Sequence, residues 1–163
     1  MSAPAILEPV MTALAQEAAT QSVLLQLGVI SAQGVIDWAT DIRQREGEKA
    51  APGIIELSTT PATRLDLIGA ALHRLQRESD YWPAVRAALA KAYAFLLVRP
   101  DESRRVARAL YALASKGFPE VPEDLNFMYY MDDAFVRARA GARGTEDDAR
   151  LDLLLELAKF KQP

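Results

Sequence analysis

The chain has 163 residues, of which 50% are hydrophobic and 25% charged, and its 19 Lys plus Arg against 22 Asp plus Glu give a net charge of −3. This length suits a single domain of ordinary size, and the composition is too apolar for a disordered chain. The acidic balance excludes a general positive field for holding a phosphate backbone, so we expect no direct nucleic-acid partner.

Apolar residues recur at helical spacing along nearly the whole chain, whereas strand-like alternation is hard to find. This pattern predicts an all-α fold, a single-domain bundle of six to seven mostly antiparallel helices. The expected helices cover approximately 10–27, 32–44, 61–77, 81–99, 101–116, 125–140 and 146–160. Residues 1–9 are expected to be flexible, and loops are expected at 46–53 and 141–145. Residues 54–57 are too few to decide between a strand and a helical turn.

Capping signals mark several of these helix ends. Gly28 stands where a C-terminal cap is expected, and Ser31 is a typical N-cap. Thr145 is followed three residues later by Asp148, a pattern that resembles a capping box. These signals predict a helix end at 28 and helix starts after 31 and 145.

The inventory of reactive side chains is small. The chain has no cysteine and one histidine, His73. Disulfides, thiolate nucleophiles, cysteine-based metal sites and histidine clusters are therefore excluded. We predict that the protein is not an enzyme and binds no cofactor and no metal, although an enzyme or small-molecule site built around His73 and carboxylates is an alternative.

The N-terminal segment gives no sign of a targeting signal or membrane span. Residues 1–9 contain no basic stretch followed by a long apolar run, and nowhere do about 18 uncharged apolar residues follow one another. The sequence therefore predicts a cytoplasmic protein with no membrane partner.

The tetrapeptide at 130–133, Tyr-Met-Asp-Asp, resembles the catalytic motif of reverse transcriptases. That motif belongs to a turn between two strands, and here it lies in a helical pattern, so we predict a coincidence. On a continuous helix, Asp132 would share a face with Leu125, Met128 and Val136, which predicts either a paired structural carboxylate at the edge of the core or part of an exposed patch. Asp133 is expected to pair with Arg137, one turn later.

Two groups of acidic residues are candidate binding sites. Asp148, Asp152 and Glu156 follow one another at steps of four on the last predicted helix, and Asp37 and Asp41 form a shorter pair on the second. Such a stripe is either an ordinary solvated face or a surface that meets a basic partner. Arginines on two other helices could bind partners or pair with acids of the same chain; they are Arg74, Arg77, Arg104, Arg105 and Arg108.

The segments 27–31, 35–39 and 54–58, with the sequences LGVIS, VIDWA and IIELS, resemble small all-helical bacterial toxin-immunity proteins. The resemblance implies a protein that binds and neutralises a cognate toxin, often a nuclease, without catalysis. The predicted function is accordingly an immunity or antitoxin-like protein that covers a basic toxin surface with Asp148, Asp152 and Glu156, aided by Asp37 and Asp41. The alternative is a helical adaptor or regulatory domain that forms a homodimer through an apolar helix face.

Overall fold

The computed structural model describes residues 7–77, 80–116 and 120–161, and every regular element in these ranges is helical. The all-α prediction is therefore confirmed, with eight α-helices in the described ranges instead of six or seven. The α-helices are α1 (Leu7–Leu27), α2 (Ala32–Glu46), α3 (Pro52–Thr59), α4 (Leu65–Leu75), α5 (Tyr81–Val98), α6 (Ser103–Ala114), α7 (Met131–Arg139) and α8 (Glu146–Ala158). The additional helix is α3, in the segment that the sequence left open between strand and helix.

The chain divides into two compact units, Met1–Ala88 and Leu89–Pro163, with the boundary inside α5. Each unit has buried apolar side chains of its own, as a folded body requires. The single-domain organisation stays a prediction.

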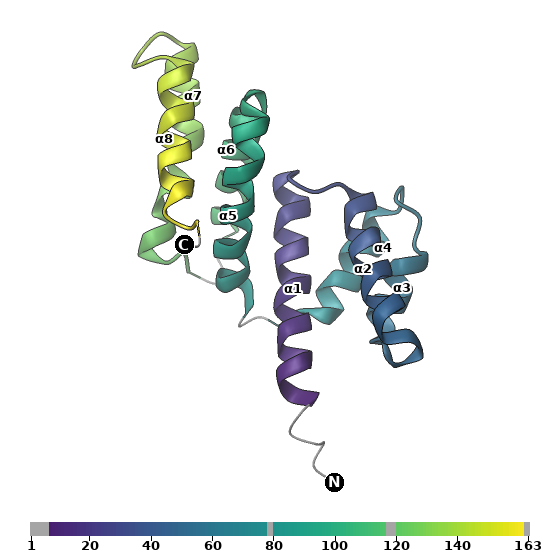
Figure 1. The fold of residues 1–163 in the computed structure, drawn as a ribbon. Helices are drawn as coiled ribbons and strands as arrows, with labels where there is room; N and C mark the ends of the chain where they lie inside the picture. Colours follow the sequence, from purple (N-terminus) through teal and green to yellow (C-terminus); the bar gives the residue numbers. More distant parts are fainter. Residues whose placement is uncertain (1–6, 78–79, 117–119, 162–163) are drawn as a thin grey trace. The chain divides into compact units, whose positions relative to one another are not determined.

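In the first unit, α2 packs on α3, and α4 contacts both α1 and α3 (Figure 1). The contacts bury one continuous apolar cluster drawn from all four helices. Its buried members are Ala18, Val35, Ile36, Ala39, Ile42, Ala50, Ile54, Leu57, Ile68, Ala71 and Leu72. Close approach of α3 and α4 depends on Gly53, because a Cβ there would stand 2.8 Å from Cγ of Leu75.

The predicted turn between α1 and α2 is confirmed in detail. Gly28 has φ +67°, and its amide donates to Leu25 O while the Val29 amide donates to Leu24 O, at 3.1 and 3.0 Å. This pair of hydrogen bonds is the Schellman arrangement that ends a helix at glycine. The Ser31 side chain then accepts from the Gly34 amide at 3.1 Å and starts α2.

Several predicted boundaries in the first unit are wrong. Residues 7–9, expected to be flexible, belong to α1, and 1–6 lie outside the described residues. The expected loop 46–53 contains a 3-10 turn (Gly47–Lys49) and the start of α3, since Pro52 is well suited to the first turn of a helix. The helix expected from Pro61 starts only at Leu65. Thr60 instead follows the last residue of α3: its backbone is extended, its amide donates to Leu57 O at 3.2 Å and its hydroxyl donates to Glu56 O at 2.7 Å.

An ion pair before α5 gives a test by pH. Arg77 donates to both carboxylate oxygens of Asp80 at 3.0 Å, and the Asp80 side chain is only 8% exposed. The hydrogen bonds from Arg77 lower the pKa of Asp80 below its ordinary value. A depressed folded-state pKa contributes stability above the unfolded-state value of about 4, which is lost as pH falls through the folded-state pKa.

We therefore expect Asp80→Asn to lower the free energy of unfolding by about 1 kcal/mol at neutral pH, a modest figure because Arg77 is half exposed. Urea unfolding of both proteins at several pH values measures the difference, which should shrink below about pH 4. A difference that stayed constant down to the lowest pH would contradict the ion-pair account.

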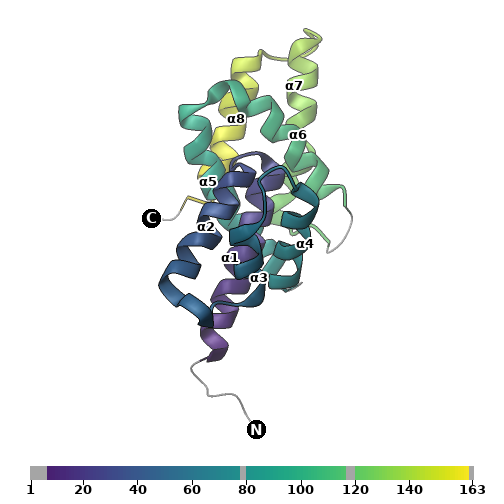
Figure 2. The same cartoon turned by 90° about the vertical axis from the view of Figure 1, so that its right-hand side faces the viewer.

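In the second unit, α7 contacts both α6 and α8, and α7 and α8 run in opposite directions, joined by a loop (Figures 1 and 2). The 3-10 helix η4 (Glu123–Tyr129) contacts α6 and α7. Buried side chains of these elements include Leu110, Leu125, Met128, Phe135, Leu153 and Leu157. The predicted loop 141–145 is confirmed, with Gly141 and Gly144 at φ +69° and +67°.

The single helix predicted over 125–140 is wrong. The segment forms η4 and then α7, and at Tyr130 the backbone hydrogen bonds change from a spacing of three residues (Tyr130 N to Phe127 O) to one of four (Ala134 N to Tyr130 O). In a 3-10 helix, residues three apart lie above one another, which brings Leu125 and Met128 onto one buried face. On α7 the buried residue is Phe135, and Val136, expected on the inner face, is 50% exposed.

Candidate functional site

The acidic strip of α8, defined as Asp148, Asp152 and Glu156, starts at the capped end of the helix. The Thr145 hydroxyl accepts from the Asp148 amide at 3.2 Å, and the Asp148 carboxylate accepts from the Thr145 amide at 2.9 Å. The predicted capping box is therefore confirmed, with Asp in place of Glu. Asp148, one of the three predicted binding carboxylates, thus stabilises the N-terminus of α8.

We expect Asp148→Ala to lower the free energy of unfolding by about 1 kcal/mol, since it removes one side of the capping box. The matched control is Asp147→Ala, because Asp147 lies in the same first turn but makes only an exposed ion pair, at 3.0 Å to Arg150. Urea unfolding followed by circular dichroism compares the two. Equal losses would contradict the capping role.

The other two strip residues differ in their pairing. Asp152 is exposed and makes no ion pair within the part of the chain that the structure describes. Glu156 is half-buried and accepts from Lys159 at 2.7 Å. Arg150, on the same helix, pairs with Asp147 and Glu146. Asp152 is therefore the strip carboxylate with neither an ion pair nor a capping hydrogen bond among the described residues.

The strip runs along two hollows of the second unit, which both have Tyr130 in their walls. The α7–α8 hollow has a volume of about 480 Å³ and includes Asp148 and Asp152, with Arg137 and Arg143. The η4–α8 hollow, of about 570 Å³, includes Glu156 and the aromatic rings of Phe127 and Phe160. All three predicted carboxylates of α8 thus line concave surface, which periodicity alone could not reveal.

A leucine ridge, defined as Leu151 and Leu155, lies next to the strip. The two side chains are 57% and 58% exposed, and each stands three or four residues from Asp152 or Asp148 on the helix surface. The opposite side of α8 is buried through Leu153 and Leu157. A helix that is apolar on two sides commonly packs against something on each of them. The leucines of 151–157 carry this signal in the sequence, which the spacing of the acidic residues does not contain.

Tyr130 is a further exposed residue beside the strip. Its side chain is 65% exposed, and its ring contacts that of Tyr129 edge-on at 6.5 Å between centroids. Tyr129 is anchored by a hydrogen bond from its hydroxyl to Ala114 O. An exposed tyrosine beside anchored neighbours is a typical interface residue.

The Tyr-Met-Asp-Asp segment contains no strand–turn–strand arrangement in this structure. Asp132 is half-buried and makes no ion pair among the described residues. Leu125 and Met128, expected on the same face of one helix, belong to η4, whereas Asp132 belongs to α7. Arg139, seven residues after Asp132, lies 3.7 Å from Glu146. The predicted pair between Asp133 and Arg137 is confirmed at 2.8 Å.

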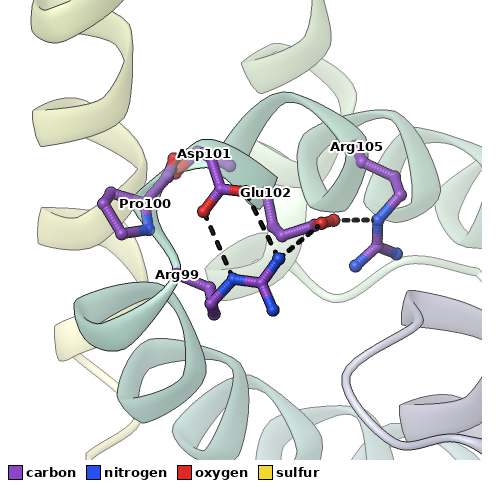
Figure 3. Close-up of polar contacts among 6 residues, drawn as sticks. Arg99, Pro100, Asp101, Glu102 and Arg105 are labelled. Carbon is purple, nitrogen blue, oxygen red and sulfur yellow. Dashed lines mark hydrogen bonds and ion pairs between the residues drawn. The ribbon is translucent and has the colours of Figure 1, made fainter.

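Several of the arginines considered as basic patches are paired within the chain. At the turn between α5 and α6, Arg99 lies 3.4 Å from both Asp101 and Glu102, and Glu102 also binds Arg105 (Figure 3). Arg99 lowers the pKa of Asp101 below its ordinary value. In the first unit Arg74 pairs with Glu56 and Arg77 with Asp80. These arginines balance acids of the same chain, so they add little to an anion-binding surface.

The remaining candidates lie in the first unit. Asp37 accepts a hydrogen bond from Gln33 at 2.9 Å, and Asp41, one turn later on α2, is exposed without an ion pair in the described ranges. His73 is exposed on α4. Among the described residues, its ring has one polar contact, at 3.4 Å to the side-chain amide of Gln76. No nucleophile or acid–base partner accompanies it in those contacts.

Comparisons with known proteins give no relative: no family model, no curated protein and no solved structure matches this chain. Within the described ranges, no three metal-ligating side chains gather into a group that could hold an ion. None of the helices in those ranges has the length and apolar character needed to cross a membrane.

Proposed function

We propose that this chain is a non-catalytic binding protein of the toxin-immunity or antitoxin kind, which neutralises a basic protein toxin by covering it with the acidic strip of α8. The observation that carries the proposal is the position of Asp152, an exposed carboxylate with no ion pair among the described residues, beside the leucine ridge and in the wall of a hollow that contains Tyr130. Apolar and aromatic anchors supply buried area, and the charge selects the partner.

A nuclease is the class of toxin that this chemistry fits best. An enzyme that holds a phosphate backbone needs a basic site, and an acidic protein that covers such a site associates quickly and excludes neutral or acidic competitors. The protein would act in the cytoplasm, where the nucleic acid that it protects lies. Asp37 and Asp41 are a separate acidic group whose contribution is tested by reversing them independently.

Homodimerisation is the second candidate, favoured by the exposed leucine ridge. A twofold pairing brings the same patch of both copies together, so the strip beside the ridge would approach its own counterpart. Like charges at such an interface reduce affinity. A basic partner meets no such penalty, and for this reason we place it first. Sedimentation at increasing concentration separates the candidates, since a strict monomer counts against the dimer.

The test is a comparative capture from a lysate of the source cells with three tagged baits: the unchanged chain, Asp152→Lys and Glu48→Lys. Glu48 is exposed in the first unit and undergoes the same change of charge, so it controls for net charge. We expect a basic protein in stoichiometric amount with the unchanged chain and Glu48→Lys, its loss with Asp152→Lys, and its release by salt. A protein retained equally by all three baits, or recovery of this chain alone, would contradict the proposal.

A further inference from the structure

The η4–α8 hollow combines two kinds of side chain that together bind cations. Its walls include aromatic rings and carboxylates, and its volume of about 570 Å³ is large enough for one long side chain. The lining residues are Glu123, Asp124, Phe127, Tyr130, Glu156, Lys159 and Phe160. Aromatic faces attract a cation through the ring quadrupole, and carboxylates supply hydrogen-bond acceptors for it.

In the aromatic part of the hollow, two of the rings pack against each other. Phe127 of η4 is buried and packs against Phe160, with ring centroids 5.9 Å apart and an angle of 34° between the planes. Phe160 is half-buried and Tyr130 is exposed, so these two side chains have surface available to a ligand. The wall therefore combines two rings that pack against each other with the exposed ring of Tyr130.

A cation of the chain itself already lies at this site. The Lys159 ammonium group is 2.7 Å from a carboxylate oxygen of Glu156, and both residues line the hollow. The pair is formed by residues three apart on one helix and is partly exposed, which makes it weak and replaceable. The position of Lys159 thus indicates that the hollow accommodates a positive charge. Lys159 also competes with any external cation for Glu156.

We propose that the η4–α8 hollow binds the guanidinium group of an arginine side chain presented by the basic partner. Arginine fits better than lysine because its planar group stacks on aromatic faces and donates two parallel hydrogen bonds to one carboxylate. Stacking on Phe160 or Tyr130 leaves the edge of the guanidinium group for Glu156. The inference rests on the proposed function for the origin of the arginine, but the hollow can be tested without the partner.

The experiment titrates the isotopically labelled full chain with N-acetyl-arginine N-methylamide and follows the chemical shifts by NMR. The neutral citrulline analogue is the matched probe, since it keeps the shape and loses the charge. We expect saturable shifts at Tyr130, Glu156 and Phe160 with the arginine probe, and affinity at least about threefold weaker for citrulline, as expected when the cation–π and charge-assisted contacts are lost.

Two lysine variants sharpen the test. Lys159→Ala frees Glu156 and is expected to strengthen arginine binding about threefold, in keeping with the small energy of an exposed pair. Lys161→Ala removes the same charge nearby, but Lys161 stacks over Tyr93 at 5.5 Å and does not line the hollow, so it should leave the affinity unchanged. Unshifted amide signals of Leu153 and Leu157 show that the fold is intact.

The inference is overturned if no saturable shifts occur with the unchanged chain and Lys159→Ala, if citrulline binds as well as arginine, or if the two lysine variants have equal affinities. These results leave the proposed function separately measurable. Loss of partner binding in Asp152→Lys with no arginine binding would mean that the strip acts without the hollow, whereas arginine binding without a basic partner would remove only the proposed source of the arginine.

Discussion

Replacing Phe135 by alanine is expected to lower the free energy of unfolding by about 3–5 kcal/mol, the range found when a large aromatic side chain is removed from a packed core. Phe135 is 1% exposed and is the buried residue of α7, which contacts both α6 and α8. Its removal leaves a cavity that these helices can fill only in part. Urea unfolding followed by the helical circular dichroism signal measures the change.

The adjacent Val136→Ala is the matched control, because Val136 is exposed on the same helix and its truncation should change the stability by less than about 0.5 kcal/mol. Both tryptophans, Trp38 and Trp82, lie in the first unit, so their fluorescence reports that unit. If the chain is one cooperative domain, the fluorescence transition of Phe135→Ala shifts together with the dichroism transition. A loss no greater than that of Val136→Ala would contradict the assigned packing of α7.

Reversing two charges of the acidic strip is expected to weaken binding of the basic partner about a hundredfold, or about 2.7 kcal/mol. In Asp152→Lys with Glu156→Lys, attraction to the partner becomes repulsion at two positions of one helix face. Isothermal titration with the purified partner measures the affinity, and the effect should decrease as salt is added, since screening shortens the range of exposed charges.

The control for this pair is Glu46→Lys with Glu48→Lys, which changes the net charge equally at exposed positions of the first unit. We expect it to reduce affinity by less than about threefold, through the general field alone. If the two double variants weakened binding equally, net charge and not the strip would determine the affinity.

Features that depend on a few neighbouring residues could be predicted from the sequence. The cap at Ser31, the turn at Gly28 and the capping box of Thr145 and Asp148 are all local arrangements, in which a side chain or a glycine satisfies the amides and carbonyls of its own helix end. Their residues stand within a few positions of one another, so tertiary packing did not overrule them.

Features that depend on tertiary packing could not be predicted. A helical period fits residues 125–140 well, yet the segment forms the 3-10 helix η4 before α7, and Leu125 and Met128 share a buried face in either kind of helix. Thr60 and Pro61 are residue types typical of a helix start, but Thr60 instead follows the last residue of α3, where its hydroxyl donates to Glu56 O. In both cases the same residues satisfy two local patterns, and contacts with other helices decide between them.

The candidate site shows the same division. The spacing of Asp148, Asp152 and Glu156 correctly places them on one side of a helix, because residues four apart are neighbours there. The hollows beside them are lined by side chains of separate segments, α7 with α8 in one and η4 with α8 and Phe160 in the other, and Tyr130 lies between η4 and α7. The capping role of Asp148 was visible in the sequence. That Asp152 has neither a capping hydrogen bond nor an ion pair among the described residues was not.

The central claim is that the acidic strip of α8 is the surface that binds a basic protein. Hydrogen–deuterium exchange of the free chain and of its complex with the captured partner tests this claim most directly, because slowed exchange maps the bound surface without any substitution. We predict protection over α8 (Glu146–Ala158) and the neighbouring η4 (Glu123–Tyr129), with little change over α3. Protection confined to α2 and α3, with α8 exchanging as in the free protein, would contradict the claim.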